Sequence, residues 1–216
     1  MTPRVTATVD LAAIRHNLRV VRATAPGSRV MAAVKADAYG HGAIPVALAL
    51  QAEQVDAFAV ACMEEALQLR EAGISHTPVA LLEGVISLEE AEQAVQQQLQ
   101  VVVHDHWQIA LLEQLPAEAP VQLWFKLDSG MHRLGFPLAD VPQLVATLKA
   151  HPGWVFHGWI THLACADEAE NPATAQQIAA YNQALHGVAG PRSIANSAGL
   201  LAWPEALPGE VARRLD

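Results

Sequence analysis

The sequence is poor in several kinds of residue, and each shortage excludes a class of protein. Two cysteines, Cys62 and Cys165, occur in 216 residues, which is too few for a disulfide framework and favours a reducing compartment. Lysine and arginine number 13 against 22 acidic residues, a net charge of −9, so no basic stripe is available for nucleic-acid phosphates. No apolar run approaches the roughly 20 residues of a membrane span, and the first residues lack the apolar stretch of a signal peptide. We therefore expect a cytoplasmic protein with neither a nucleic-acid nor a membrane partner.

Short β-rich runs alternate with longer helical segments along the chain. The predicted strands are Val30–Lys35, Val55–Ala61, Pro78–Leu82, Gln100–His104, Val121–Leu127, Val155–His162 and Arg192–Ala195. The predicted helices include Asp10–Thr24, Met63–Ala72, Leu88–Gln98, Asp105–Gln114, Asp140–Ala150 and Pro172–His186. This alternation is typical of parallel βαβ units, and runs that are apolar on both faces indicate strands covered on both sides.

Seven such units without a linker predict a single α/β domain over residues 1–216. The architecture that we expect is a (β/α)₈ barrel of the TIM type that stops before its eighth strand, since a closed barrel has eight. An early run, Val5–Val9, is predicted as a strand of another layer. A doubly wound sheet is the alternative, but no G-x-G-x-x-G follows the first strand.

Chemically active side chains stand where the predicted strands end. Lys35 ends the first strand, Lys126 lies near the end of the fifth, His162 ends the sixth, and Asn196 and Ser197 follow the seventh. In a barrel these ends meet at one mouth, where the active site lies. Lys35 either reaches solvent from a strand end or is an amine held there to capture a carbonyl group.

The segment WFKLDSGMHRLGF, Trp124–Phe136, is the most informative stretch of the chain. Lys126 lies inside an apolar strand, where an ammonium is disfavoured and a neutral amine is open to modification. Arg133 lies in a loop with two glycines, which suits the aiming of a guanidinium at a carboxylate. The alternative is structural: an ion pair of Asp128 with Lys126 or with Arg133 could hold the loop.

Four motifs, AVKADAYGHG, KLDSGMHRLGF, THLACADE and ANSAGLL, occur in the chain in this order. Together they closely resemble the barrel domain of bacterial alanine racemases, which use pyridoxal 5′-phosphate. The likeness runs from about Thr6 to Glu205, and the motifs have the spacing of the family. The resemblance implies the interconversion of L- and D-alanine, for peptidoglycan synthesis or for D-alanine catabolism.

The resemblance also implies roles around the cofactor. Lys35 would form a Schiff base with the cofactor aldehyde and serve as one of two catalytic bases. Tyr39 would hydrogen-bond the cofactor phosphate, and Asn196 and Ser197 would hold it at a helix N-terminus. His162 would lie beside the pyridine ring. Each residue also has a purely structural alternative. Tyr39 could cover the rim of the barrel, His162 could be a core histidine hydrogen-bonded to a backbone carbonyl, and Ser197 could be a helix N-cap.

On the substrate side, Arg133 would contact the carboxylate of alanine, and Lys126 resembles the lysine that many members carry as a carbamate. After residue 209 the chain reads EVARRLD, which does not match the eighth strand of the family. We therefore expect three features of the family to be missing: the arginine opposite the pyridine nitrogen, the C-terminal β domain, and the tyrosine of that domain. In the family this tyrosine is the second base, which one subunit of a homodimer donates to the other. We expect a truncated and poorly active form.

Two other functions remain open from the sequence. A non-catalytic barrel of pyridoxal-phosphate homeostasis would need no second domain, but it would not need DSGMHRLGF or Lys126. A metal-dependent amidohydrolase is suggested by the H-x-H of His104 and His106 with Lys126. That family has its H-x-H at the first strand, whereas this one follows the fourth. We interpret His104–His106 as a strand exit and helix cap, and expect no metal site.

Overall fold

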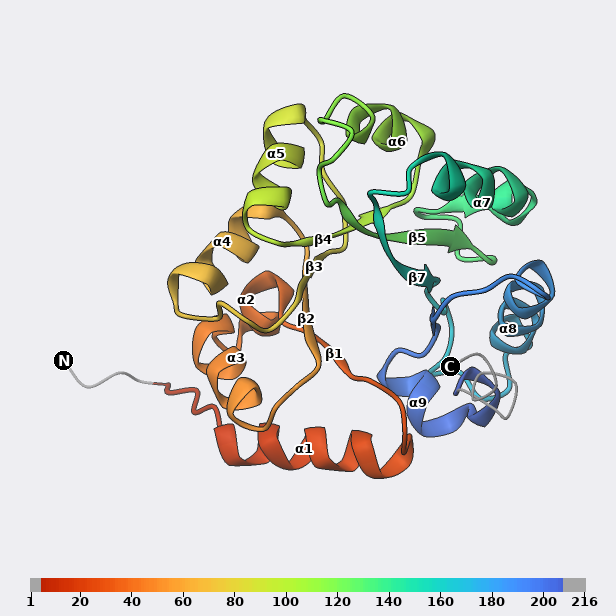
Figure 1. Ribbon diagram of the computed structural model, residues 1–216. Coiled ribbons are helices and arrows are strands. Elements are labelled where there is room, and N and C mark those ends of the chain that lie inside the picture. Colours follow the sequence, from red (N-terminus) through yellow and green to blue (C-terminus); the bar gives the residue numbers. More distant parts are fainter. Residues whose placement is uncertain (1–4, 208–216) are drawn as a thin grey trace.

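The computed structural model describes residues 5–207, which form one curled sheet of parallel strands with helices around it (Figure 1). The strands are β1 (Met31–Ala33), β2 (Ala57–Val60), β3 (Val79–Leu81), β4 (Gln100–Val103), β5 (Gln122–Asp128), β6 (Phe136–Pro137), β7 (Val155–Ile160) and β8 (Arg192–Ser193). The helices are α1 (Leu11–Thr24), α2 (Lys35–Gly40), α3 (Ala43–Ala52), α4 (Met63–Glu71), α5 (Leu88–Gln96), α6 (His106–Leu112), α7 (Val141–Ala150), α8 (Ala173–Ala184) and α9 (Ser197–Ala202). Two 3₁₀ turns, Leu138–Asp140 and Pro204–Ala206, precede α7 and follow α9.

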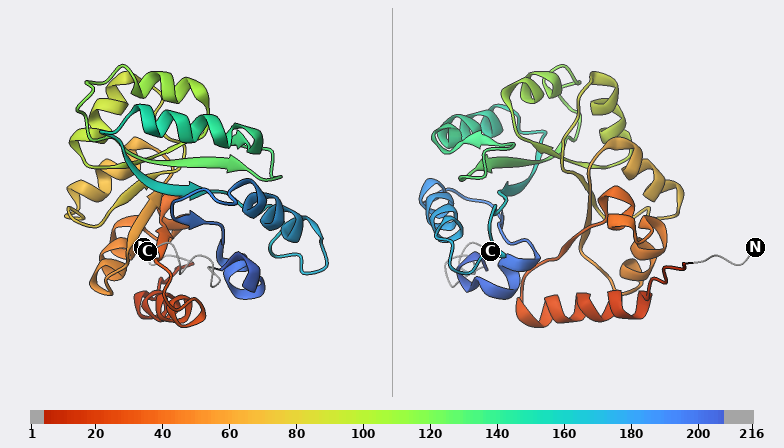
Figure 2. Two further views of the ribbon diagram at one scale, coloured as in Figure 1. Left: turned by 45° about the vertical axis from the view of Figure 1, so that its right-hand side comes forward. Right: turned by 180° about the vertical axis from the view of Figure 1, so that it is seen from behind.

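The strands succeed one another around the sheet in sequence order. That order is β1-β2-β3-β4-β5-β7-β8, all parallel, with the two-residue β6 attached to β5. Figure 2 shows that the sheet curls and that the helices lie on its outer side. A doubly wound sheet reverses its strand order and carries helices on both faces, so that alternative is excluded. The predicted barrel wall is confirmed, and within residues 5–207 its two end strands, β1 and β8, do not pair with each other.

The two faces of the sheet are occupied by different sets of side chains, because successive residues of a strand point to opposite sides. Phe125 of β5 packs in the large core between the sheet and the helices. Its neighbour Trp124 instead belongs to a smaller buried cluster with Ile160 of β7, on the inner face. Lys126 follows Trp124 by two residues and pairs with Ile160. The period of the strand therefore places Lys126 on the inner face of the barrel wall.

The starts of several helices are set by side-chain caps that the sequence predicts. Asp10 accepts hydrogen bonds from the amides of Ala12 and Ala13 and begins α1. Ser87 accepts from the amide of Glu90 at 3.1 Å, and the Glu90 carboxylate accepts from the amide of Ile86. These reciprocal bonds form the capping box that opens α5.

Three features differ from the expectations. Val5–Val9 is not a strand: these residues have no regular structure, Val5 is 87% exposed, and no strand within residues 5–207 pairs with them. The first strand ends at Ala33 instead of Lys35, because the backbone turns there. Helix α3, Ala43–Ala52, was not predicted, since it is apolar on nearly every side and lacks an amphipathic stripe.

None of the helices within residues 5–207 combines the length and the apolar character that crossing a bilayer demands.

Candidate active site at the strand ends

Three of the predicted site residues lie at the same edge of the sheet. Lys35 comes two residues after β1, Lys126 lies near the end of β5, and His162 comes two residues after β7. The strands are parallel, so their carboxyl ends share one edge. Lys126 is 9% exposed, whereas Lys35 and His162 are partly buried. The structure therefore brings Lys35, Lys126 and His162 to one edge of the sheet.

The electrostatics of the mouth reflect a gathering of positive charge. Burial lowers the pKa of Lys126 to about 8, aided by repulsion from Arg133 and Lys35 and opposed by attraction to Asp128. Burial also lowers the pKa of His162 to about 4, again with repulsion from Lys126, Arg133 and Lys35. His162 is therefore neutral at physiological pH, whereas Lys126 is mostly charged, with about a tenth of it present as the uncharged amine at pH 7. A site with three mutually repelling cations favours an anionic ligand.

Arg133 lies in the loop between β5 and β6, and Asp128 shapes that loop. The Asp128 carboxylate accepts the amides of Gly130 and His132 at 2.9 and 3.0 Å, and the ring of His132 lies 3.0 Å from it. Burial alone would raise the pKa of Asp128, but these hydrogen bonds together lower it. The suggested ion pair of Asp128 with Lys126 or Arg133 is absent among residues 5–207, where Asp128 pairs with His132. Arg133 is exposed at the mouth.

Gly135 ends this loop at a position that only glycine fits. Its φ is +136°, and a Cβ there would stand 2.6 Å from the amide nitrogen of Asp128 and 2.7 Å from the carbonyl carbon of Leu127. The loop thus folds back tightly against the end of β5 before β6 begins. The glycines of the segment hold the loop close to the strand that carries Lys126.

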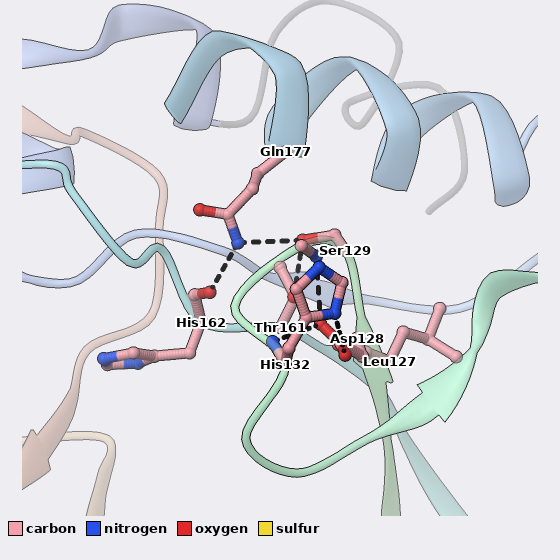
Figure 3. Close-up of polar contacts among 8 residues, drawn as sticks. Leu127, Asp128, Ser129, His132, Thr161, His162 and Gln177 are labelled. Carbon is pink, nitrogen blue, oxygen red and sulfur yellow. Dashed lines mark hydrogen bonds and ion pairs between the residues drawn. The ribbon is translucent and has the colours of Figure 1, made fainter. Parts of the chain in front are cut away.

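A buried polar network connects the loop to His162 and to α8 (Figure 3). The Ser129 and Thr161 hydroxyls are 2.9 Å apart, and Thr161 donates to the carbonyl of Leu127 at 2.9 Å. Gln177 of α8, which is 3% exposed, donates to the backbone carbonyl of His162 at 3.0 Å. The ends of β5 and β7 are therefore tied to each other and to one helix.

Tyr39 lies in an unusual turn directly after Lys35. The residues Ala36–Tyr39 have φ between +50° and +56°, so this is a left-handed turn of four residues. Such φ values are rare for residues other than glycine. Tyr39 is 62% exposed, and its phenol is accessible to a ligand.

Asn196 and Ser197 stand at the start of α9, as predicted. Asn196 is the N-cap: its side-chain Oδ1 accepts the amide of Gly199 at 2.8 Å, and its side-chain Nδ2 lies 3.5 Å from the backbone carbonyl oxygen of Leu163. The alternative that Ser197 serves as the N-cap is thus wrong, because Asn196 takes that position. The Ser197 side chain is exposed at the first turn.

His104 and His106 form the strand exit and helix start that we interpreted from the sequence. Asp105 caps α6 by accepting the amide of Trp107 at 3.2 Å. The His104 ring lies 3.1 Å from the carbonyl oxygen of Glu83, whereas the His106 ring lies 3.0 Å from the Asp140 carboxylate. The two rings thus have separate partners. Over the described part of the chain, no three His, Cys, Asp or Glu residues stand together as metal ligands would.

The sequence reasoning missed the residues that support the site. Gln177 and Thr161 lie in segments whose pattern is simply that of a helix and a buried strand end. Glu65 of α4, which contacts the turn after Lys35, was also missed. Its place in the first turn of a predicted helix was the only available signal, and that signal indicates a cap.

Comparison with known proteins places this geometry in a family. Residues 9–213 match the family model described as alanine racemase, N-terminal domain. The chain is 45% identical over 199 residues to an alanine racemase of Halorhodospira halophila, covering 92% of this chain and 54% of that protein. It is 46% identical to a catabolic alanine racemase of Pseudomonas putida, covering 93% of this chain and 55% of the relative.

Solved structures agree with this match. The biosynthetic alanine racemase of Pseudomonas aeruginosa superposes with a TM-score of 0.85 at 42% identity, over 92% of this chain and 55% of that one. The alanine racemase of E. faecalis gives a TM-score of 0.84 at 31% identity, over 93% and 56%. The chain spans about half the length of these relatives. With the fold, the strand-end residues and the family model in agreement, the chain belongs to the alanine racemase family and corresponds to its N-terminal domain.

Proposed function

We propose that this chain provides the pyridoxal-phosphate-binding barrel of an alanine racemase, an enzyme that interconverts L- and D-alanine. The observation that carries the proposal is the convergence of Lys35, Lys126 and Arg133 beside a neutral His162 at the carboxyl ends of the strands. The cofactor carries a phosphate and the substrate a carboxylate. A mouth with excess positive charge is complementary to both anions.

The side chains present fit the cofactor. Asp128 is the acidic group that attracts the Lys126 ammonium, but its carboxylate already accepts the loop amides and contacts His132. The positive charge of the mouth is therefore left for an anionic ligand. The exposed side chains of Tyr39 and Ser197 would donate to the phosphate, while Asn196 fixes the helix start beside it. When bound, pyridoxal phosphate supplies an electron sink that makes the substrate α-proton removable.

The chain's own residues would then move one proton. Lys35 would hold the cofactor through its amine and, once released, remove or return the α-proton on one face of the substrate. Arg133 would bind the substrate carboxylate and fix its orientation. His162, neutral at working pH, would lie beside the ring without adding a further positive charge there.

Lys126 would be carried as a carbamate. The neutral amine nitrogen would form a bond to the carbon of carbon dioxide and lose one N–H proton to solvent, which gives an N-carboxylate. The low pKa of Lys126, about 8, leaves a neutral amine available for this addition. The product is an anion, which would pair with Arg133 and replace repulsion by attraction.

The parts of the activity that need the rest of the relatives' length are also proposals. We infer a second acid–base group on the opposite face of the substrate, supplied by the region that this chain does not span, and a homodimer. We further infer a cytoplasmic location, with a role in supplying D-alanine for the cell wall or in its catabolism. A non-catalytic cofactor-binding barrel remains the alternative, and it predicts cofactor binding without proton transfer.

Borohydride reduction tests the covalent step. The whole sequence contains three lysines, Lys35, Lys126 and Lys149, so a reduced pyridoxal adduct can be mapped to one of few peptides. We expect the adduct on Lys35, and its loss by at least about tenfold in Lys35→Ala. Lys149→Ala, at an exposed position in the last turn of α7, is the matched control and should label normally. An undiminished adduct in Lys35→Ala would show that the assignment is wrong.

A further inference from the structure

The backbone beside Lys35 adopts a conformation that its own residues do not favour. The residues Ala36–Tyr39 are an alanine, an aspartate, an alanine and a tyrosine, all in the left-handed region with ψ between 38° and 52°. For L-residues with a Cβ this conformation is unfavourable at each position. Because no glycine relieves these four residues, contacts from outside must hold the turn.

Glu65 of α4 supplies such a contact. Its Oε1 accepts the amide of Ala36 at 2.7 Å, and its Oε2 accepts the amide of Ala61 at 2.7 Å. Ala36 directly follows Lys35, and Ala61 directly follows β2. One carboxylate thus joins the residue next to Lys35 to the end of the neighbouring strand, through short hydrogen bonds to a charged acceptor.

Local capping of α4 explains only half of this arrangement. Glu65 is the third residue of the helix, where a carboxylate commonly accepts an amide just before the helix, as Glu65 does from Ala61. The bond to Ala36 reaches 29 residues back along the chain and has no part in the cap. The far end of the turn has its own support, since Asp37 accepts the amides of Gly42 and Ala43. At the Lys35 end of the turn, the amide of Ala36 donates its hydrogen bond to the side chain of Glu65.

We propose that Glu65 is a positioning residue that holds the left-handed turn and thereby directs the Lys35 amine into the mouth. The part that concerns Lys35 chemistry rests on the proposed function, whereas the part that concerns the turn does not. Glu65 acts through the backbone amide of Ala36 and touches neither cofactor nor substrate in this account. It is partly buried, in contrast to its exposed neighbour Glu64.

Two variants on one helix separate this role from a general effect of charge. Glu65→Gln keeps the shape of the side chain but puts an NH₂ group against one of the two amides. Glu64→Gln removes the same charge one residue earlier, at an exposed position. Amide hydrogen exchange of the 216-residue chain without cofactor is the first readout. We expect exchange at Ala36 and Ala61 to be at least about tenfold faster in Glu65→Gln, with Val102 in the core unchanged.

The second readout concerns Lys35 itself. After reduction with added pyridoxal phosphate, the share of adduct on Lys35 relative to the other lysines should fall about tenfold in Glu65→Gln and stay constant in Glu64→Gln. A merely structural role would lower labelling at all lysines together and leave this ratio unchanged. An unchanged ratio in Glu65→Gln would overturn the proposal.

The outcomes also distinguish the two proposals. If the parent chain forms no adduct on Lys35, the proposed function fails, and the exchange rates at Ala36 and Ala61 still decide whether Glu65 holds the turn. Equal acceleration at Val102 would mean that Glu65 supports the whole fold, which would contradict a positioning role. Should Glu65→Gln not fold, Glu65→Asp keeps the charge but is one methylene shorter. We expect it to release at least one of the two amides and to give the same pattern.

Discussion

The buried amine of Lys126 makes the stability of the protein depend on pH. Its pKa of about 8 lies below the ordinary value of 10.5, mainly because burial disfavours the charged form. The folded state therefore binds this proton less tightly than the unfolded state does. Stability is lowest below the folded pKa, where Lys126 is charged in both states, and rises as pH increases from about 8 toward 10.5.

The magnitude follows from the size of the shift. A difference of about 2.5 pKa units corresponds to about 3 kcal/mol of unfavourable free energy at low pH. Lys126→Met replaces the ammonium by an apolar group of similar length and removes this contribution. Between about pH 7.5 and 9.5 the parent should gain about 2 kcal/mol of unfolding free energy relative to Lys126→Met. Other titrating groups cancel in this comparison because both proteins share them.

Urea unfolding in buffers free of carbon dioxide measures the difference, since a carbamate would change the charge of Lys126. Lys149→Met is the matched control, because Lys149 is exposed and its replacement should leave the pH dependence unchanged. Parallel stability curves for the parent and Lys126→Met would refute the reasoning. They would mean that the Lys126 amine is solvated and that the cations at the mouth do not converge on it.

Three further predictions concern the walls of the site. Gly135→Ala should lower the unfolding free energy by about 3 kcal/mol, since a Cβ at φ +136° meets the backbone of Asp128; urea unfolding with an unchanged midpoint would contradict this. The ring of His162 should titrate with a pKa of about 4, and this pKa should rise in Arg133→Ala because one repelling charge is removed; an NMR midpoint near the ordinary 6.5 would show that the ring is solvated. Gln177→Met leaves the amide of Ala164 and the carbonyl of His162 without the Gln177 side chain as partner and should lower the unfolding free energy by about 1–3 kcal/mol. Gln176→Met, at an exposed position, should leave the unfolding free energy unchanged. Equal effects of the two variants in urea unfolding would show that the buried network does not stabilise the fold.

The barrel wall could be predicted because its strands have a pattern that few other structures produce. Runs such as Val101–Val103 are apolar on both faces and are followed by amphipathic helices, and caps such as Ser87 mark where those helices begin. The strand-end lysines could be placed because parallel strands bring their carboxyl ends to one edge. Even the inner face of Lys126 follows from the period of β5.

The remainder depends on contacts between distant segments. The left-handed turn at Ala36–Tyr39 could not be predicted, because the bond that holds its Lys35 end comes from Glu65, 29 residues away in the sequence. Val5–Val9 alternates like a strand but has no partner in the described chain, and a strand needs a partner. The alternative role of Ser197 as an N-cap fell one residue too late, since both Asn196 and Ser197 are good N-cap residues and Asn196 takes the position.

The central claim is that Lys35 moves the α-proton of a bound amino acid, and solvent deuterium exchange tests it most directly. The 216-residue chain is incubated with pyridoxal phosphate in deuterium oxide, with L-alanine or D-alanine, and the α-deuterium is followed by NMR. Exchange of one enantiomer should exceed that caused by the free cofactor and should fall to the free-cofactor rate in Lys35→Ala. Exchange no faster than with the free cofactor, or equally fast in Lys35→Ala, would contradict the account.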